Sequence, residues 1–239
     1  MADCGENRRK ESLMIFDDRI HAGQILADLL ENEKIDFKKS LVAAIPRGGV
    51  PVAAQIARRF KLSLFPLVIK KIGAPINAEL AIGATASFGR PILDRELIRD
   101  LDISSDYLKK EILKKKREAK NREFFLGVNL SKLKFGKKTI IVVDDGLATG
   151  QTAKLAAKVL RQFGAGKIIL TVPCAPALVI KQLGTDYDKI ICPETRDDFM
   201  AVGQFYRNFR PVEEAGVKNI LDQNDAIVRT KVAKSNNQN

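Results

Sequence analysis

Two adjacent carboxylates at the end of an apolar run are the residues of this sequence best suited to chemistry. Residues 139–152 read TIIVVDDGLATGQT, so Asp144 and Asp145 follow a β-branched run and precede a turn of small residues. Glycine permits close backbone approach, and the start of a helix presents unpaired N–H groups to an anion. Neighbouring carboxylates accept hydrogen bonds from vicinal sugar hydroxyls. The segment therefore predicts a ribose 5-phosphate site, whose phosphate is held by Gly146, Leu147, Ala148, Thr149, Gly150, Gln151 and Thr152.

A second candidate anion site follows the apolar run at 41–46. Arg47 precedes Gly48 and Gly49, and a helical pattern begins directly after them. Two consecutive glycines leave amide N–H groups uncovered, and a guanidinium fork matches the geometry of phosphate oxygens. Neither turn is a Walker loop or a dinucleotide fingerprint, because GxxxxGK[ST] and GxGxxG are both absent from the sequence.

The elements that must position these turns alternate along the chain. Apolar runs without polar alternation are typical of strands that are buried on both faces of a parallel sheet, and they occur at 41–46, 64–69, 139–145, 167–173 and 189–193. Helical patterns occur at 18–31, 49–60, 150–163, 175–184 and 212–222. This order predicts a doubly wound α/β fold with a mainly parallel sheet flanked by helices.

Two further segments depart from the alternation. Residues 71–93 are rich in glycine, proline and small side chains and too long for a tight connection, which predicts a mobile loop or hairpin that forms a small hood over the site. Residues 104–126 predict a long helix with an N-cap at Ser104 or Ser105. The polar ends predict an N-terminal extension at 1–15, a domain at 16–222 and a flexible C-terminal tail at 223–239.

The 239 residues carry 41 Lys plus Arg against 29 Asp plus Glu, a formal charge of +12. Such an excess suits nucleic acid, anionic lipid or a small polyanionic ligand. About half of it lies in one segment, 108–122, which has eight cations and two glutamates. Pairs four residues apart, Glu111 with Lys115 and Glu118 with Arg122, favour a solvated helix face there, and a contact with RNA, DNA or protein is the alternative.

Several classes of protein are disfavoured by composition. Three widely separated cysteines without a CxxC pair argue against a disulfide framework or a zinc site, and His21 is the only histidine. The sequence has no uncharged apolar run of 18 residues, and its first residues, MADCGENRRKES, lack the apolar stretch of a signal peptide. We therefore expect a cytoplasmic protein without a membrane span.

The turn VVDDGLATGQT resembles the phosphoribosyl pyrophosphate signature of the type I phosphoribosyltransferases, and it is most similar to the adenine and uracil members. Four more segments are similar to stand-alone phosphoribosyltransferase-domain proteins: FDDRIHAGQILADLL (16–30), IPRGGVPVA (45–53), KKIGAPINAELAIGA (70–84) and DDFMAVGQFYRNF (197–209). The resemblance extends over about residues 16–222.

The resemblance implies a role for individual residues. The acidic pair orients the ribose, and the pyrophosphate is bound by Arg47, Gly48, Gly49, Lys70 and Lys71. Arg47, Lys71 and Glu79 join the two aspartates as candidate catalytic groups, although Lys70 departs from the Arg-Lys pattern of relatives. Phe199 and Val202 are the candidate contacts of the acceptor base. Ala148 stands where hypoxanthine-guanine enzymes have an acid, which disfavours those two bases.

The implied activity is transfer of ribose 5-phosphate from phosphoribosyl pyrophosphate to a nitrogenous base or amine, with release of pyrophosphate. Mg²⁺ is the implied cofactor, bound near Asp144 and Asp145 through ligand and water rather than directly by protein. A homodimer is implied by analogy alone. The alternative is a sensor of phosphoribosyl pyrophosphate on the same fold, with a regulatory or nucleic-acid-binding role, because both proteins would keep the same ligand turns.

Overall fold

A five-stranded parallel sheet forms the centre of the protein, for which a computed structural model describes residues 14–133 and 135–236. The strand order is β2-β1-β6-β7-β9, and every neighbouring pair is parallel. The strands are β1 (Ser40–Ala44), β2 (Leu64–Pro66), β6 (Thr139–Val143), β7 (Lys167–Thr171) and β9 (Lys189–Ile191). The five predicted apolar runs are therefore the five strands, and the doubly wound α/β prediction is confirmed.

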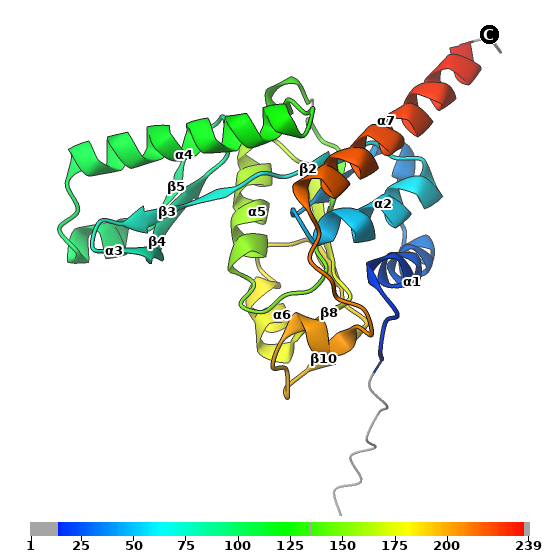
Figure 1. Ribbon diagram of the computed structural model, residues 1–239, viewed down its shortest axis with the longest axis horizontal. Helices are drawn as coiled ribbons and strands as arrows, with labels where there is room; N and C mark the ends of the chain where they lie inside the picture. The colour runs from blue at the N-terminus through cyan, green and yellow to red at the C-terminus, as the bar shows by residue number, and fades with distance from the viewer. Residues whose placement is uncertain (1–13, 134, 237–239) are drawn as a thin grey trace, which may run out of the picture.

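Helices cover both faces of this sheet (Figure 1). One face packs against α5 (Gln151–Gln162) and α6 (Ala177–Leu183), and the other packs against α1 (Arg19–Glu31), α2 (Gly49–Phe60) and α7 (Glu214–Asn236). Successive strand residues alternate between the two cores, as Ile140 and Val142 on one side and Ile141 and Val143 on the other demonstrate. Burial on both faces explains why these strands lack polar residues.

A second, smaller core lies to one side of the sheet. The antiparallel strands β3 (Lys70–Ala74), β4 (Asn77–Thr85) and β5 (Ile92–Leu93) pack against α3 (Arg95–Asp100) and α4 (Ser105–Phe125). Figure 1 shows α4 lying across this unit, which we call the hood. The segment predicted as a loop or hairpin is thus a hairpin extended by a third strand. The predicted cap of the long helix is confirmed, because the Ser104 side chain accepts a hydrogen bond from the amide of Tyr107.

The remaining elements are short and lie between the larger ones. They are β8 (Cys174–Pro176), β10 (Glu194–Arg196) and three single-turn 3₁₀ helices, η1 (Phe37–Lys39), η2 (Leu130–Lys132) and η3 (Val202–Phe205). Phe16 pairs with Tyr206 in an isolated parallel bridge, which brings the start of the described chain beside the segment that follows η3.

The backbone of the segment predicted as a flexible tail from residue 223 is helical up to Asn236, because α7 continues through it, and its flexibility stays a prediction. The polar composition of this segment gave no indication of a helix. Val217 and Leu221, which come earlier in α7, are buried against α2 and its neighbours. The predicted extension at 1–15 lies almost entirely outside the described residues, as do 237–239. No helix in the described part of the chain is long and apolar enough to cross a membrane.

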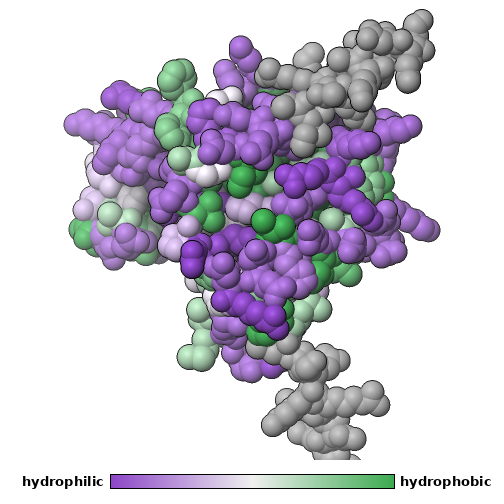
Figure 2. Space-filling view, turned by 45° about the vertical axis from the view of Figure 1, so that its right-hand side comes forward, coloured by the Kyte–Doolittle hydropathy of each residue, from purple (hydrophilic) through white to green (hydrophobic). Residues whose placement is uncertain are grey.

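The visible surface is mainly hydrophilic, and its hydrophobic residues form small separate patches (Figure 2). The most exposed large apolar side chains are Met200 and Phe124, at 91% and 87% exposure. Isolated groups of this kind are ordinary on a soluble surface.

Candidate functional site

The turns after β1 and β6 are in direct contact, as expected for neighbouring parallel strands whose carboxyl ends meet at one edge. A Cβ added to Gly48 would lie 1.9 Å from Oδ2 of Asp145. A Cβ on Gly49 would lie 2.6 Å from the carbonyl oxygen of Val143 and 2.8 Å from Cα of Asp144. Both glycines are therefore required by the close approach of the acidic turn. The structure thus brings together two predicted parts of the site that lie about a hundred residues apart.

The small-residue turn depends on two glycines with positive φ. Gly146 has φ +148° and Gly150 has φ +68°, which is the left-handed region that residues with a Cβ avoid. Gly150 is also the N-cap of α5, so the turn delivers its amides to the start of that helix. A Cβ on Gly146 would meet the side chains of Val202 and Cys174 at 2.6 and 2.8 Å. The turn is therefore enclosed by η3 and β8.

The amides of this turn divide into two groups. The amide of Leu147 donates to the carbonyl oxygen of Cys174 at 3.0 Å, so it holds the turn to β8 and is not free to bind phosphate. Within the described ranges, the amides of Ala148, Thr149 and Gly150 donate no hydrogen bond. A cavity of about 380 Å³ opens beside them; its lining is Thr149, Gly150, Gln151, Lys154, Val179, Gln182 and Leu183. Free amides at a helix N-terminus beside a cavity suit a phosphate group.

The two carboxylates differ in their surroundings. Oδ1 of Asp144 accepts a hydrogen bond from the amide of Asp145 at 2.9 Å, and Oδ2 of Asp145 accepts one from Nε of Arg19 at 2.7 Å. Burial raises the pKa of Asp144 well above its usual value, and the neighbouring charge of Asp145 raises it further, while Arg19 opposes both effects. Keeping both buried carboxyls ionised costs free energy. A ligand that brings hydroxyl donors or a cation to this pair would offset that cost.

Arg19 was not among the predicted site residues, although it lies inside the matched segment 16–30. It comes from the first turn of α1, 126 residues from Asp145, and its side chain is 11% exposed. Its guanidinium lies 3.9 Å from the ring centroid of Phe209, and Nη1 donates to the carbonyl oxygen of Arg210 at 2.8 Å. No local pattern marks Arg19 as a site residue, since it follows the cap residue Asp18 in the mixed helix start RIHAGQ.

The acceptor candidates lie on the side of the acidic pair formed by η3. Val202 packs against Gly146, so the structure places it at the turn. Phe199 is half-buried and stacks on Phe205, with 5.1 Å between ring centroids. Tyr206 donates its hydroxyl to the backbone oxygen of Asp145 at 2.7 Å. The acceptor roles of Val202 and Phe199 stay predictions.

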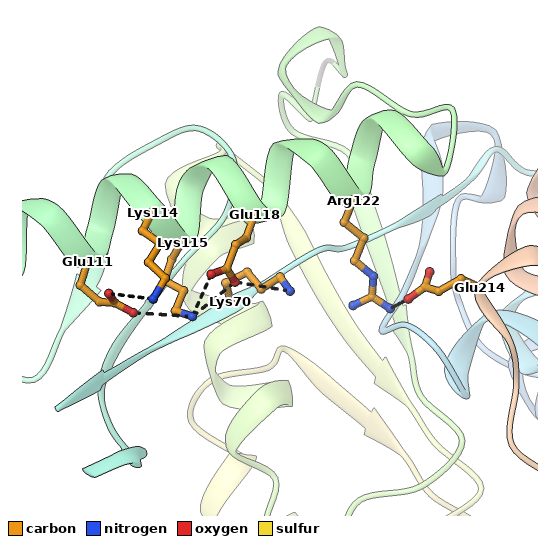
Figure 3. Close-up of polar contacts among 7 residues, drawn as sticks. All are labelled: Lys70, Glu111, Lys114, Lys115, Glu118, Arg122 and Glu214. Carbon is orange, nitrogen blue, oxygen red and sulfur yellow. Dashed lines mark hydrogen bonds and ion pairs between the residues drawn. The ribbon is translucent and has the colours of Figure 1, made fainter. Parts of the chain in front are cut away.

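The remaining candidates are distributed more widely. Arg47 is exposed, and the peptide bond that joins it to Pro46 is cis. Lys70 lies 3.8 Å from Glu118 of α4, so its ammonium has a carboxylate partner within the hood (Figure 3). Lys71 is exposed and, as the next residue of the strand, points to the opposite face. Glu79 is exposed on β4, and in the described structure no contact joins it to the acidic pair.

The basic helix α4 uses several of its cations internally, on the side that faces β3 (Figure 3). The predicted pair of Glu111 and Lys115 is confirmed at 3.6 Å. The predicted pair of Glu118 and Arg122 is wrong. Arg122 instead contacts Glu214 of α7 at 2.6 Å. Glu118 pairs with Lys115 of the same helix at 3.1 Å and with Lys70 of β3 at 3.8 Å. Of these cations, Arg122 joins the hood to the body of the protein.

Metal ligands of the usual protein kinds are not clustered here. In the parts of the chain that the structure describes, no group of three or more His, Cys, Asp or Glu side chains could hold a metal ion. Burial raises the pKa of the Cys192 thiol to about 11, and Cys174 is fully buried.

The same segments match known proteins. The sequence model described as the phosphoribosyl transferase domain matches residues 15–210. A protein of Mycobacterium tuberculosis named "Putative phosphoribosyl transferase" is 34% identical over 211 residues, which are 88% of this chain and 47% of that protein. The chain therefore spans about half the length of the curated relative it matches.

A solved structure is similar to this chain in both sequence and fold. The crystal structure of TT1426 from Thermus thermophilus is 32% identical and superposes with a TM-score of 0.76, over 87% of this chain and 98% of that one. The family match includes both strand-end turns, the acidic pair and the acceptor-side segment. On these grounds the chain belongs to the phosphoribosyl transferase domain family.

Proposed function

We propose that this chain transfers the ribose 5-phosphate unit of phosphoribosyl pyrophosphate to a nitrogenous base or amine and releases pyrophosphate. The observation that carries the proposal is the close approach of Gly48 and Asp145, because one belongs to the turn proposed for pyrophosphate and the other is an acid proposed for the ribose. The unpaired amides of Ala148, Thr149 and Gly150 supply the third part, a phosphate site, next to that contact. One ligand with a ribose, a 5-phosphate and a pyrophosphate would engage all three.

In this reaction the bond between the anomeric carbon and the pyrophosphate oxygen breaks, and a bond from that carbon to the acceptor nitrogen forms. The pyrophosphate leaves with the electron pair of the broken bond, and the acceptor nitrogen loses a proton. Positive charge develops at the anomeric carbon, and carboxylates stabilise such oxocarbenium-like states. Asp144 and Asp145 are therefore proposed to bind the ribose hydroxyls and to stabilise this charge.

The leaving group requires positive charge. Arg47 and Lys71 are the exposed cations that we propose for it, together with the amide of Gly48. The amide of Gly49, which was also predicted to bind pyrophosphate, donates to the carbonyl oxygen of Ile45 at 3.1 Å and is not free to do so. Lys70 would contribute only if its contact with Glu118 opened. The hood is proposed to close over the reacting centre and exclude water, with Glu79 a candidate acid on its β4 strand.

Mg²⁺ fits the donor set at this site. Asp144 and Asp145 offer carboxylate oxygens, and Mg²⁺ in phosphate sites is typically held by one or two carboxylates, water and the phosphates of the substrate. The ion would neutralise the negative charge of the pyrophosphate. The acidic pair would hold it through the ligand and water, with no protein-only site needed.

The test is release of pyrophosphate from phosphoribosyl pyrophosphate and Mg²⁺ in the presence of a panel of purine and pyrimidine bases and amines. We expect release with at least one acceptor, and loss of release in the double variant Asp144→Asn, Asp145→Asn, whose fold is checked by circular dichroism. Undiminished release in that variant would refute the assignment of the pair. Tight ligand binding without release for any acceptor would favour the sensor instead, and a salt series of RNA and DNA binding would then test a regulatory target.

The homodimer and the cytoplasmic location are also part of this proposal. Family resemblance supports the dimer. Light scattering coupled to size-exclusion chromatography measures the first, and cell fractionation measures the second.

A further inference from the structure

Arg19 lies beside the acidic pair, and no role follows for it from the reaction as proposed above. Its Nε donates to Oδ2 of Asp145, its Nη1 donates to the Arg210 carbonyl oxygen, and its guanidinium covers the ring of Phe209. A cation with 11% side-chain exposure has lost most of its hydration, so its charge must be compensated by a neighbouring carboxylate. In the described residues, Arg19 forms the only ion pair made by either Asp144 or Asp145.

Arg19 is itself held in place from two sides. The segment before α1 runs parallel to the segment after η3, because the amide of Phe16 donates to Phe205 at 2.8 Å and the amide of Arg207 donates to Phe16 at 2.9 Å. The side chain of Asp18 then caps α1 by accepting the amides of the second and third residues that follow it. The backbone of Arg19 is therefore fixed relative to the acceptor side of the site before any ligand binds.

The segment after η3 also holds Asp145. Tyr206 donates to its backbone oxygen at 2.7 Å and stacks on Phe209, with 4.9 Å between ring centroids. Asp145 thus has its backbone fixed by Tyr206 and one carboxylate oxygen fixed by Arg19. No backbone, hydroxyl or basic group of the described residues donates to its other oxygen, Oδ1, and the remaining polar partner of this carboxyl is the adjacent carboxyl of Asp144, through a side-chain hydrogen bond.

We propose that Arg19 is a positioning residue for the phosphoribosyl ligand: it holds the Asp145 carboxylate against Gly48 and neutralises part of the acidic pair, so that Oδ1 is presented to the ribose. This inference rests on the proposed function. Without Arg19 the two adjacent carboxylates would repel each other and the incoming pyrophosphate. Arg19 therefore affects ligand binding in addition to any contribution to folding.

A purely structural role is the competing explanation, because Arg19 also ties α1 to the segment at 205–210. The chain contains a matched control for it. Arg207 reaches back to Asp17 at 2.8 Å and ties the same two segments, but it is 73% exposed and does not touch Asp145. Substitution of Arg207 removes a tie between the segments without changing the charge beside the acidic pair.

The experiment compares Arg19→Gln, Arg19→Lys and Arg207→Gln with the unsubstituted full chain. Calorimetry measures the Kd for phosphoribosyl pyrophosphate with Mg²⁺, and differential scanning measures Tm without ligand. We expect Arg19→Gln to raise Kd by about tenfold or more, which corresponds to about 1.4 kcal/mol. We expect Arg19→Lys to recover part of the loss because it retains the charge, and Arg207→Gln to leave Kd unchanged.

Each outcome decides between the explanations. An unchanged Kd in Arg19→Gln with a lower Tm would overturn the proposal and leave a structural tie. An equal rise of Kd in Arg207→Gln would overturn it too, because the tie between the segments would then suffice. If the glutamine variant does not fold, the ratio of Kd between Arg19→Lys and the unsubstituted chain decides, and a ratio of one refutes the role. An unsubstituted chain that binds no ligand refutes the proposed function first, and Arg19 with it.

Discussion

Substitution of Gly48 by alanine tests the central contact of the site. A Cβ at this position would lie 1.9, 2.4 and 2.7 Å from Oδ2, Cγ and Oδ1 of Asp145, and these are its three nearest heavy atoms. Ordinary contact begins at 3.4 Å, so the carboxylate must move by about 1.5 Å. The backbone conformation of Gly48 is ordinary, with φ −60°, so the clash is the whole cost.

The carboxylate cannot move without losing its partner. Oδ2 of Asp145 lies 2.7 Å from Nε of Arg19, and a shift of this size breaks a charge-assisted hydrogen bond. Overpacking typically costs about 1–3 kcal/mol, and a lost hydrogen bond to a charged group costs about 1.5–3 kcal/mol. Because one movement causes both, we expect Gly48→Ala to lower the free energy of unfolding by about 2–4 kcal/mol. We expect ligand affinity to fall by about tenfold or more, since the ribose-binding oxygen is displaced.

A double-mutant cycle isolates the contact. In an Asp145→Ala background the three clashing atoms are gone, so Gly48→Ala should cost little there, and the coupling free energy should approach the full cost of the single substitution. Denaturant unfolding measures stability and calorimetry measures ligand affinity. Gly136→Ala is the matched control, because nothing lies within 4 Å of its added Cβ. An equal cost of Gly48→Ala in both backgrounds would refute this geometry.

Three other predictions concern the site and its supports. Because the pKa of Asp144 is raised in the folded protein, the unfolding free energy should fall as pH rises from the ordinary carboxyl pKa through that raised value. Asp144→Asn should remove this slope and raise Tm at neutral pH, as pH-dependent thermal unfolding measures. Gly150 has φ +68°, and a Cβ added there would lie 2.5 Å from Cγ1 of Val179. Gly150→Ala should therefore lower the unfolding free energy by more than about 1–2 kcal/mol in chemical denaturation and weaken ligand binding. An unaffected affinity would contradict the proposed phosphate site. Glu214→Gln, which weakens the 2.6 Å contact with Arg122, should lower the unfolding free energy by about 1–2 kcal/mol, whereas substitution of an exposed lysine of α4 should change it by less than about 0.5 kcal/mol.

Sequence patterns located the strands and the turns because each depends on neighbouring residues. An uninterrupted β-branched run such as 139–143 can hardly be anything but a buried strand, and Gly146 and Gly150 mark the turn that their φ angles require. The hood was harder to predict from the sequence. Its core combines Ile72 and Ile82 with residues of α3 and α4, and glycine-rich strands of this kind read as a loop.

Ion pairs were the least predictable feature, since a charged side chain selects among partners that are distant in sequence. Spacing assigned Glu118 to Arg122, but Arg122 contacts Glu214, ninety-two residues further along the chain. Arg19 went unassigned for the same reason. Nothing in a local window indicates that the first turn of α1 lies against the end of β6. Proximity of this kind is set by the tertiary fold, which brings chain ends together through contacts such as the bridge of Phe16 with Tyr206.

The residues around the acidic pair hold the two carboxylates in an arrangement that lowers the stability of the folded protein. Gly48 and Gly49 lie so close to the pair that neither can carry a side chain, and Tyr206 and Arg19 fix Asp145 from outside. The carboxylates are therefore held in place, and the pKa of Asp144 is raised first by its burial and further by the neighbouring charge of Asp145. A fold that keeps two adjacent acids in this state without ligand loses stability that a ligand with hydroxyls and a divalent cation would restore. Stabilisation of the protein by Mg²⁺ and phosphoribosyl pyrophosphate should accordingly be larger than stabilisation by either alone, because the ion and the sugar relieve the same repulsion.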